Sequence, residues 1–198
     1  MVGSVLVAPR EVHDLVFRCA RVAGCDAGGA DRTARNVTAA EVRFGEALPA
    51  VVEALASEAF TTTWAMAADA LVSAEVDARD HGSATATFDP PVPLAALAAT
   101  VTEASARGVV VSGIPSDATG GLEIATLDLA PGQVESVAGL RTDAYSDGLP
   151  VDRGAFEALA ESITVQEGAR LPGAGRRPTD PVDVEDSVWT LVTELAGN

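Results

Sequence analysis

The sequence predicts an α+β fold: a helix-rich single domain with a small mixed sheet. Apolar residues recur at helical spacing through most of the first 80 positions, which indicates a cluster of helices. Two short apolar runs, at 109–111 and 122–129, are typical of strands. With 198 residues and 47% apolar content, the chain is long enough to bury a core as one domain over 1–198. Two subdomains, a helical 1–80 and a mixed α/β 81–198, are the alternative.

Four helices are expected in the first part of the chain. Pro9 suits the first turn of the first helix, and Gly24 suits a left-handed cap after it. Thr62 or Thr63 can cap the fourth helix, which carries Trp64. The expected helices run over 9–23, from Asp26 or the glycine pair 28 and 29 to Gly45, from Pro49 to Ala59, and from the threonine cap toward Asp80.

The middle of the chain is expected to combine strand and helix. The stretch SATATFDPPVP over 83–93 alternates and is rich in proline, which suits an edge strand or a loop. Pro93 then begins a helix that Gly108 stops. Two later helices are expected, one capped by Asp152 that buries Phe156, Leu159 and Ile163, and one capped by Asp183 that buries Val184, Val188, Leu191 and Leu195.

Two strands are expected after Gly108. Val109, Val110 and Val111 form a continuous apolar run, which predicts a strand covered on both faces. The second strand spans 122–129, and its alternation slips near Ala125 and Thr126 as a β-bulge would cause.

The charge of the chain excludes several classes of partner. A formal net charge of −16 opposes docking on DNA, RNA or an anionic bilayer, because phosphate binding depends on clustered Lys and Arg. No window has the roughly 20 apolar residues that a membrane-spanning helix requires, and the N-terminus does not resemble a signal peptide. We therefore expect no nucleic acid and no membrane partner, and a cytoplasmic location.

The two cysteines do not indicate chemistry. Cys19 and Cys25 are spaced neither as a redox pair nor as zinc ligands. The favoured interpretation is that both are small buried apolar residues. No metal site is indicated, and the cofactor, if the protein has one, is unknown.

The principal candidate for ligand binding is the Gly- and Arg-rich segment near residue 170. Glycine allows backbone amides to approach a ligand closely, and guanidinium groups pair with carboxylate or phosphate. Arg170, Gly173, Gly175 and Arg176 supply these groups, with Arg177 beside them. The alternative is a loop that is ordered by internal ion pairs and holds the last helix in place.

Three other residues are weaker candidates. Ser112 ends the valine-rich strand and leads into a loop of small polar residues, where α/β sheets often bind ligands; its frame VVVSG lacks the glycine of a nucleophile elbow, and an ordinary turn is the alternative. His81, with Asp80 beside it, is a candidate general base. A capping or surface role is its alternative. Glu167 is the other candidate catalytic residue.

The two ends of the chain resemble a bacterial family known only as a domain of unknown function. At the C-terminal end the matching residues are Glu167, Arg170, Gly173, Ala174 and Gly175. At the N-terminal end, the resemblance implies a short strand, a helix that ends in an Ala-Gly turn, and a second long helix. It implies no reaction, because the family has no assigned activity.

Two functions are compatible with these observations. The first is a metabolic enzyme or enzyme subunit that acts on a small anionic metabolite held by the Gly- and Arg-rich segment. The second is a non-catalytic accessory or partner subunit, whose Ala-rich helices pack against another chain or in a homo-oligomer.

Overall fold

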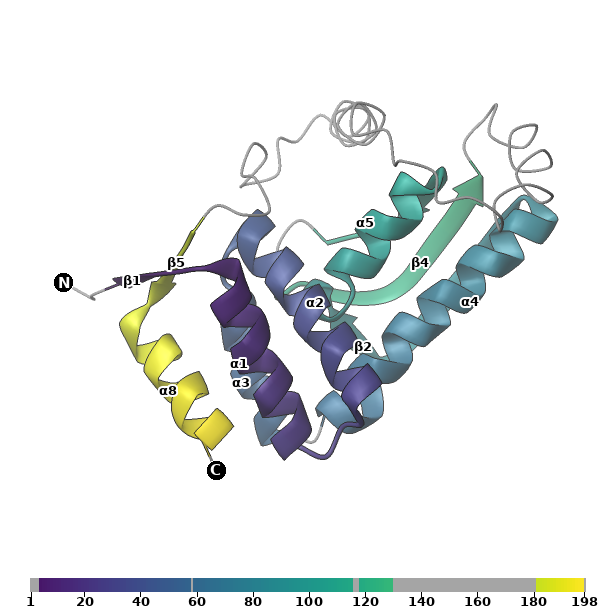
Figure 1. The fold of residues 1–198 in the computed structure, drawn as a ribbon. Coiled ribbons are helices and arrows are strands. Elements are labelled where there is room, and N and C mark those ends of the chain that lie inside the picture. Colours follow the sequence, from purple (N-terminus) through teal and green to yellow (C-terminus); the bar gives the residue numbers. More distant parts are fainter. Residues whose placement is uncertain (1–3, 58, 116–117, 130–180, 198) are drawn as a thin grey trace, which may run out of the picture.

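The fold class is confirmed as helix-rich α+β. The computed structural model describes residues 4–57, 59–115, 118–129 and 181–197. Within these ranges, helices pack around one another and on two small sheets of two and three strands (Figure 1). The expectation of a mixed sheet is wrong for these ranges, because every neighbouring pair of strands runs antiparallel.

Helices α1 (Pro9–Val22), α2 (Ala27–Phe44) and α3 (Ala47–Ala56) agree closely with the sequence. Helix α2 begins as predicted, because the Asp26 carboxylate accepts the N–H of Gly29 at 2.7 Å. Helix α3 begins at Ala47, before the predicted start at Pro49, because the carboxylate of Glu41 in α2 accepts backbone N–H groups of its first turn. Local capping signals therefore placed the first two helices, whereas a tertiary contact placed the third.

Helix α4 (Ala65–His81) follows a π-helical turn, η1 (Phe60–Trp64), without a break. The predicted cap at Thr62 or Thr63 is wrong, because both residues already lie inside helical backbone. The Phe60 and Trp64 rings contact each other, with centroids 4.8 Å apart, and both side chains are buried. This aromatic contact fixes the turn where a threonine cap was expected.

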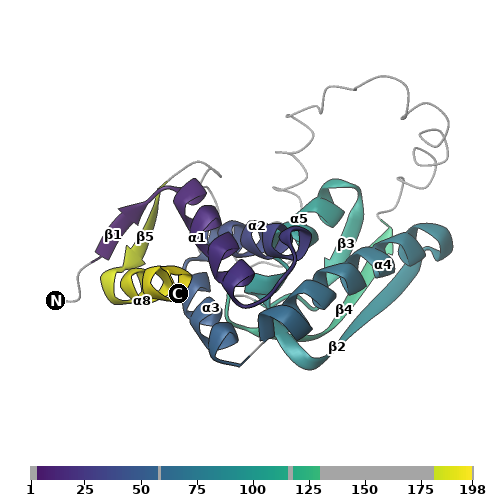
Figure 2. The ribbon, with the colours of Figure 1, turned by 60° about the horizontal axis from the view of Figure 1, so that its bottom comes forward.

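The three-stranded sheet has the order β2–β4–β3, with strands β2 (Ser83–Pro93), β3 (Val109–Ser112) and β4 (Gly121–Leu129). Between β2 and β3 the chain forms η2 (Leu94–Ala96) and α5 (Ala98–Ala106). The predicted helix from Pro93 is thus split into a 3₁₀ turn and an α-helix. Helix α4 packs on β2 and β4, and α5 packs on β3 (Figure 2).

The register of this sheet corrects the predicted bulge. Strand β4 pairs continuously with β2 from Ile124 to Asp128, so it has no irregularity at Ala125 and Thr126. The register shifts between Thr87 and Val92 of β2 instead. The prolines of β2 lie in or beside this interruption, where a missing N–H does not break the ladder.

A second sheet pairs β1 (Ser4–Val7) with β5 (Val182–Glu185), and α8 (Asp186–Gly197) follows directly. The prediction that Asp183 caps the last helix is wrong, because Asp183 and Val184 belong to β5. The alternating burial of VDVE is the pattern of a strand with one covered face. Leu191, expected in the core, is 41% exposed, while Val192 and Ala196 are buried.

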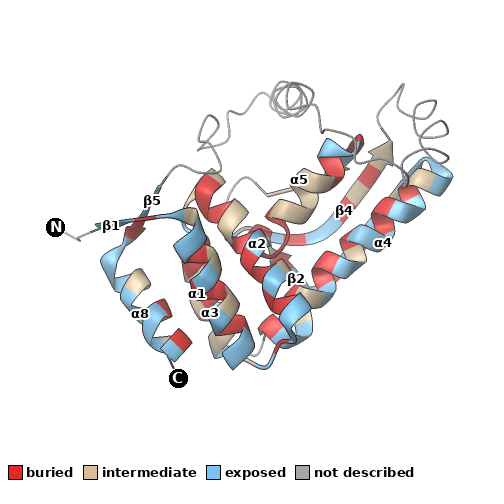
Figure 3. Ribbon diagram, viewed as in Figure 1, coloured by how far each residue is buried: buried red, intermediate tan, exposed pale blue. Residues whose placement is uncertain are grey.

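The core is built mainly of Ala, Val and Leu, and buried residues lie where helices face each other or the sheets (Figure 3). Core side chains from both sides of position 80 form one cluster. Cys19 and Cys25 are both buried and unpaired, which confirms the prediction of small buried residues. Within the described ranges, no helix is long and apolar enough to span a lipid bilayer.

Candidate functional site

The Gly- and Arg-rich candidate lies outside the described residues. Glu167, Arg170, Gly173, Gly175 and Arg176 all fall within 130–180, as does the predicted helix capped by Asp152. The hypothesis of an anion site there stays a prediction. The described ranges contain the other two candidates, His81 and Ser112.

His81 is the last residue of α4 and is exposed. Its ring Nδ1 lies 3.0 Å from the backbone oxygen of Asp77, so this nitrogen donates to a carbonyl of the last helical turn. The carbonyl of Asp77 also accepts the backbone N–H of His81 within α4, so the ring adds a second bond to an oxygen that already has a partner. The ring is thus folded back on its own helix at the protein surface, and the role as a general base stays a prediction.

Ser112 ends β3 opposite Thr126 of β4, and its side chain is exposed. The chain turns sharply at the next residue, because Gly113 has a φ of +88°. A Cβ atom on Gly113 would lie 2.6 Å from the carbonyl oxygen of Ile124, so only glycine fits this close approach. His81 and Ser112 are not brought together, since His81 precedes β2 and Ser112 ends β3, with β4 between them.

The strongest electrostatic cluster in the described ranges was not predicted from the sequence. Its centre is Glu75 of α4, whose side chain is 7% exposed. Arg107 donates to both carboxylate oxygens, at 2.7 and 2.6 Å, and Arg79 donates to one of them at 2.8 Å. Arg79 also donates to the backbone oxygen of Arg107 at 2.9 Å. These contacts join α4 to the C-terminal end of α5.

The charge state of this cluster follows from its contacts. Burial alone would raise the pKa of Glu75, but hydrogen bonds from Arg107 and Arg79 hold it below the ordinary value. The pKa of Arg107 is correspondingly raised by its bond to Glu75. All three groups are therefore charged near neutral pH, and the cluster is a satisfied ion-pair network with no proton to exchange.

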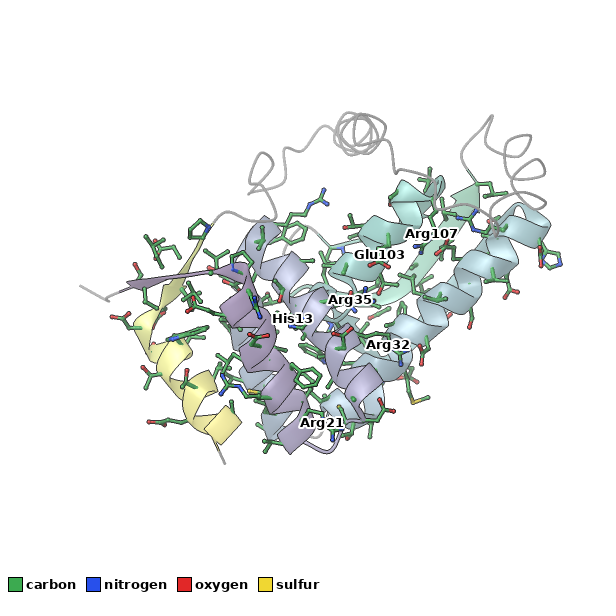
Figure 4. The ribbon with its side chains drawn as sticks, viewed as in Figure 1. His13, Arg21, Arg32, Arg35, Glu103 and Arg107 are labelled. Atoms are coloured by element: carbon green, nitrogen blue, oxygen red, sulfur yellow. The ribbon has the colours of Figure 1, made fainter. Side chains whose placement is uncertain are left out.

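The network extends across one face of the helices, where Figure 4 shows His13, Arg35, Glu103 and Arg107. Arg35 lies 3.6 Å from both Asp31 and Glu103, and His13 lies 3.5 Å from Asp31. These pairs are longer and more exposed than those of Glu75. Exposed pairs of this kind contribute about 0 to 1 kcal/mol each. Because each arginine already faces a carboxylate, this surface offers no concentration of uncompensated positive charge for an anion.

Helix α2 contains two buried polar residues that cap other helices. The Asn36 side chain accepts the backbone N–H and the hydroxyl of Thr100, at 3.0 and 3.2 Å, in the first turn of α5. The Glu41 carboxylate accepts the N–H groups of Ala47 and Leu48, at 2.7 and 3.1 Å, at the start of α3. Burial raises the pKa of Glu41 despite these bonds. Both residues thus have structural roles.

The cysteine thiols are poor candidates for nucleophilic chemistry. Burial raises the pKa of Cys19 to about 11, and burial followed by the charge of Asp26 raises that of Cys25. A thiol with a raised pKa is protonated near neutral pH and reacts slowly.

Another candidate surface is the outer face of the three-stranded sheet. Side chains that point toward α4 and α5 are mostly buried, including Ala86, Ala125 and Leu127. The intervening side chains form rows across the strands on the opposite face, which no described helix covers. The rows are Ser83, Asp128 and Val110; Thr85, Thr126 and Ser112; and Thr87 with Ile124. We call this surface the open face.

Two apolar residues of the open face are accessible to a partner. Ile124 is 53% exposed and Val110 is 36% exposed. The prediction that the valine strand is covered on both faces is therefore wrong for Val110, since the described elements cover only the side of Val109. Sequence reasoning missed the open face, although the alternation from Ile124 to Leu129 contained the signal.

The described ranges hold no group of three or more His, Cys, Asp and Glu side chains arranged to bind a metal ion. Comparisons with models of protein families, with curated proteins and with solved structures give no significant match to this chain.

Proposed function

We propose that this protein acts without catalysis, as an accessory subunit that binds another protein through the open face. The observation that supports this proposal best is the accessible apolar pair Ile124 and Val110 on a sheet face that no described helix covers. Apolar side chains gain about 25 cal/mol for each Å² removed from water. Docking at this face would supply that gain.

The composition of the sheet supports a partner surface of opposite charge. Strands β2, β3 and β4 contain Asp89, Glu123 and Asp128 and no lysine or arginine. The chain as a whole has a net charge of −16. Complementary charge accelerates association and disfavours incorrect partners. A partner with an apolar centre and a basic rim fits these properties.

The contacts of the other polar clusters support a non-catalytic role. Glu75, Asn36 and Glu41 are each occupied by bonds that hold helices together. The Nδ1 of His81 is bonded to its own helix. A catalytic group needs access to substrate, and the buried side chains of Glu75, Asn36 and Glu41 do not offer it.

Affinity purification with matched variants tests the proposal. Ile124→Asp places a charge on the open face, whereas Val76→Asp changes a residue of nearly equal exposure, 54%, on α4. We expect a protein retained by the wild type to be lost with Ile124→Asp and kept with Val76→Asp. Equal retention by all three forms, or the absence of any retained protein, would contradict the proposal.

Binding of a small anionic metabolite is the second candidate function. The pattern of Arg170, Gly173, Gly175 and Arg176 favours it, because these residues combine guanidinium groups with flexible backbone. A thermal-shift screen of anionic metabolites is the test. We expect a stabilising ligand whose effect disappears in the double variant Arg170→Ala, Arg176→Ala. An unchanged ligand effect in that variant would exclude this site.

A further inference from the structure

The two edges of the three-stranded sheet differ in how they are protected against pairing. Strand β2 contains Pro90, Pro91 and Pro93 and an interrupted register, and both features disfavour the addition of another strand along the second half of β2. Strand β3 has neither a proline nor a charged residue over its four residues. No described strand pairs with its outer edge.

We propose that an extended basic segment of the partner adds to the sheet beside β3. This inference rests on the proposed function and specifies its mode: main-chain hydrogen bonds to the β3 edge would provide affinity, and alternate side chains would provide specificity. The added strand would also extend the open face by one strand, since its outward side chains continue the rows across β4 and β3.

The rows define which side chains the segment should carry. The row that contains Val110 continues to Asp128 on β4. A lysine or arginine placed beside Val110 would lay its apolar stem over that valine and direct its charge toward Asp128. The next row holds Ser112 and Thr126, which suits a threonine or another β-branched residue. The matching segment therefore presents a basic residue and then a β-branched residue on its outward side, with apolar residues between them on its inward side.

Charge distinguishes this partner from a second copy of the chain. Two β3 edges could pair with each other, but each chain carries a net charge of −16, and the strands of this sheet contain no lysine or arginine. Two chains with this net charge repel each other over their whole surfaces. Asp128 would consequently lack a cationic partner in such a dimer, whereas a basic segment supplies one.

A short added strand is consistent with the rest of the chain. Strands β1, β5 and β3 each have four residues, and β1 and β5 pair over all four positions. Each net hydrogen bond contributes about 0.5 to 1.5 kcal/mol. The expected interaction is therefore weak for an isolated peptide and is reinforced in a partner that also contacts Ile124.

The test measures peptide binding to the full chain by fluorescence anisotropy. The probe is a capped, labelled peptide of alternating lysine and valine, compared with its glutamate and valine analogue. A third peptide keeps the lysine and valine side chains but is N-methylated at alternate backbone nitrogens. We expect the first peptide to bind, the glutamate peptide not to bind, and N-methylation to weaken binding by about tenfold or more. Equal affinity of the methylated peptide would overturn strand addition, because only charge attraction would then remain.

Two charge-matched variants place the site on the sheet. Asp128→Asn and Asp89→Asn remove the same charge, from the central strand and from the edge strand β2 respectively. We expect Asp128→Asn to weaken peptide binding by about threefold to fivefold, and Asp89→Asn to leave it within error. Binding should also slow amide hydrogen exchange at Val110 and Val111. Equal effects of the two variants, or unchanged exchange, would overturn the assignment to β3.

Two further outcomes separate this inference from the proposed function. If the lysine peptide fails to bind while Ile124→Asp still abolishes retention of the partner, strand addition is wrong and the proposed function stands. If sedimentation shows a dimer of the chain that the lysine peptide does not dissociate, a second copy occupies the edge and the inference is wrong.

Discussion

Helix α2 and strand β4 are both central elements, but they use their side chains differently. Helix α2 packs against α1, α3, α4 and α5, and its buried polar residues Asn36 and Glu41 cap two of those helices. Strand β4 lies between β2 and β3, and its outward residue Ile124 is half exposed. The hydrogen bonds of Asn36 and Glu41 explain these two residues by the stability of the fold, whereas nothing in the described fold explains the exposed Ile124 of β4.

This difference shows where function is to be sought. A buried polar group destabilises the fold unless it is hydrogen-bonded, so a fully bonded one has a structural explanation. The exposed side chains of Ile124 and Val110, two rows apart on the open face, gain nothing from the described fold. The open face is therefore the more informative surface, although the helices hold more charged residues.

The largest effect expected from a charged residue tests whether the charged groups between the helices are structural. Glu75→Ala removes the carboxylate that holds Arg79 and Arg107, and we expect it to lower the free energy of unfolding by about 2 to 3 kcal/mol. The effect is smaller than for a fully buried pair, because Arg107 is 47% exposed and can reach water. Guanidinium denaturation is the measurement.

Glu103→Ala is the control for this prediction. Glu103 also faces Arg107, but at 3.8 Å and with nearly half of its side chain exposed. We expect a change of less than about 0.5 kcal/mol in the free energy of unfolding. Equal losses in the two variants would mean that burial does not distinguish these pairs.

Asn36→Ala should have the next largest effect. It leaves the N–H of Thr100 in α5 without its acceptor, and loss of a helix cap costs about 1 to 2 kcal/mol. Thr100→Val removes only the hydroxyl bond and should cost less. If Thr100→Val and Asn36→Ala lower the midpoint of thermal denaturation equally, the bond from the Thr100 N–H to Asn36 is not the important contact.

The two buried glutamates should give opposite dependences of stability on pH. The folded-state pKa of Glu41 lies above its ordinary value of 4.5, so the unfolded chain loses this proton first as the pH rises. Wild type should therefore lose stability relative to Glu41→Gln as the pH rises above about 4.5. The folded-state pKa of Glu75 lies below 4.5. Wild type should therefore be more stable than Glu75→Gln above that pH and should lose this extra stability as the pH falls below it.

Urea denaturation of wild type and both glutamine variants between acid and neutral pH is the measurement. Glutamine keeps an acceptor oxygen at position 41, so the cap of α3 is preserved. Each variant gives a difference in the free energy of unfolding from wild type. If both differences change with pH in the same direction, the opposite pKa shifts of Glu41 and Glu75 are wrong.

The elements with local signals were predictable from sequence, and those with distant causes were not. Asp26 and Gly45 mark the ends of α2 by capping chemistry within a few residues. The start of α3 depends on Glu41, and that of η1 on the contact between Phe60 and Trp64. Strand β5 was read as the cap of a helix, because its pairing partner β1 lies at the opposite end of the chain.

The candidate site was less predictable than the fold. The pairing of Glu75 with Arg107 joins residues 32 positions apart and has no periodic signature. The valine run at 109–111 predicted two covered faces, because apolar content alone does not report which side of a strand meets the core. Only the cross-strand register places Val110 and Asp128 in one row.

The smallest expected effect tests the open face directly. Ile124 and Leu127 are apolar residues of the same strand, but Ile124 is 53% exposed and Leu127 is fully buried. Leu127→Ala should lower the free energy of unfolding by about 2 to 4 kcal/mol. Ile124→Asp should change it by less than about 0.5 kcal/mol. Chemical denaturation of the isolated chain measures both. A loss of several kcal/mol with Ile124→Asp would mean that the chain itself covers this side chain, and the isoleucine would then be explained by folding rather than by a partner.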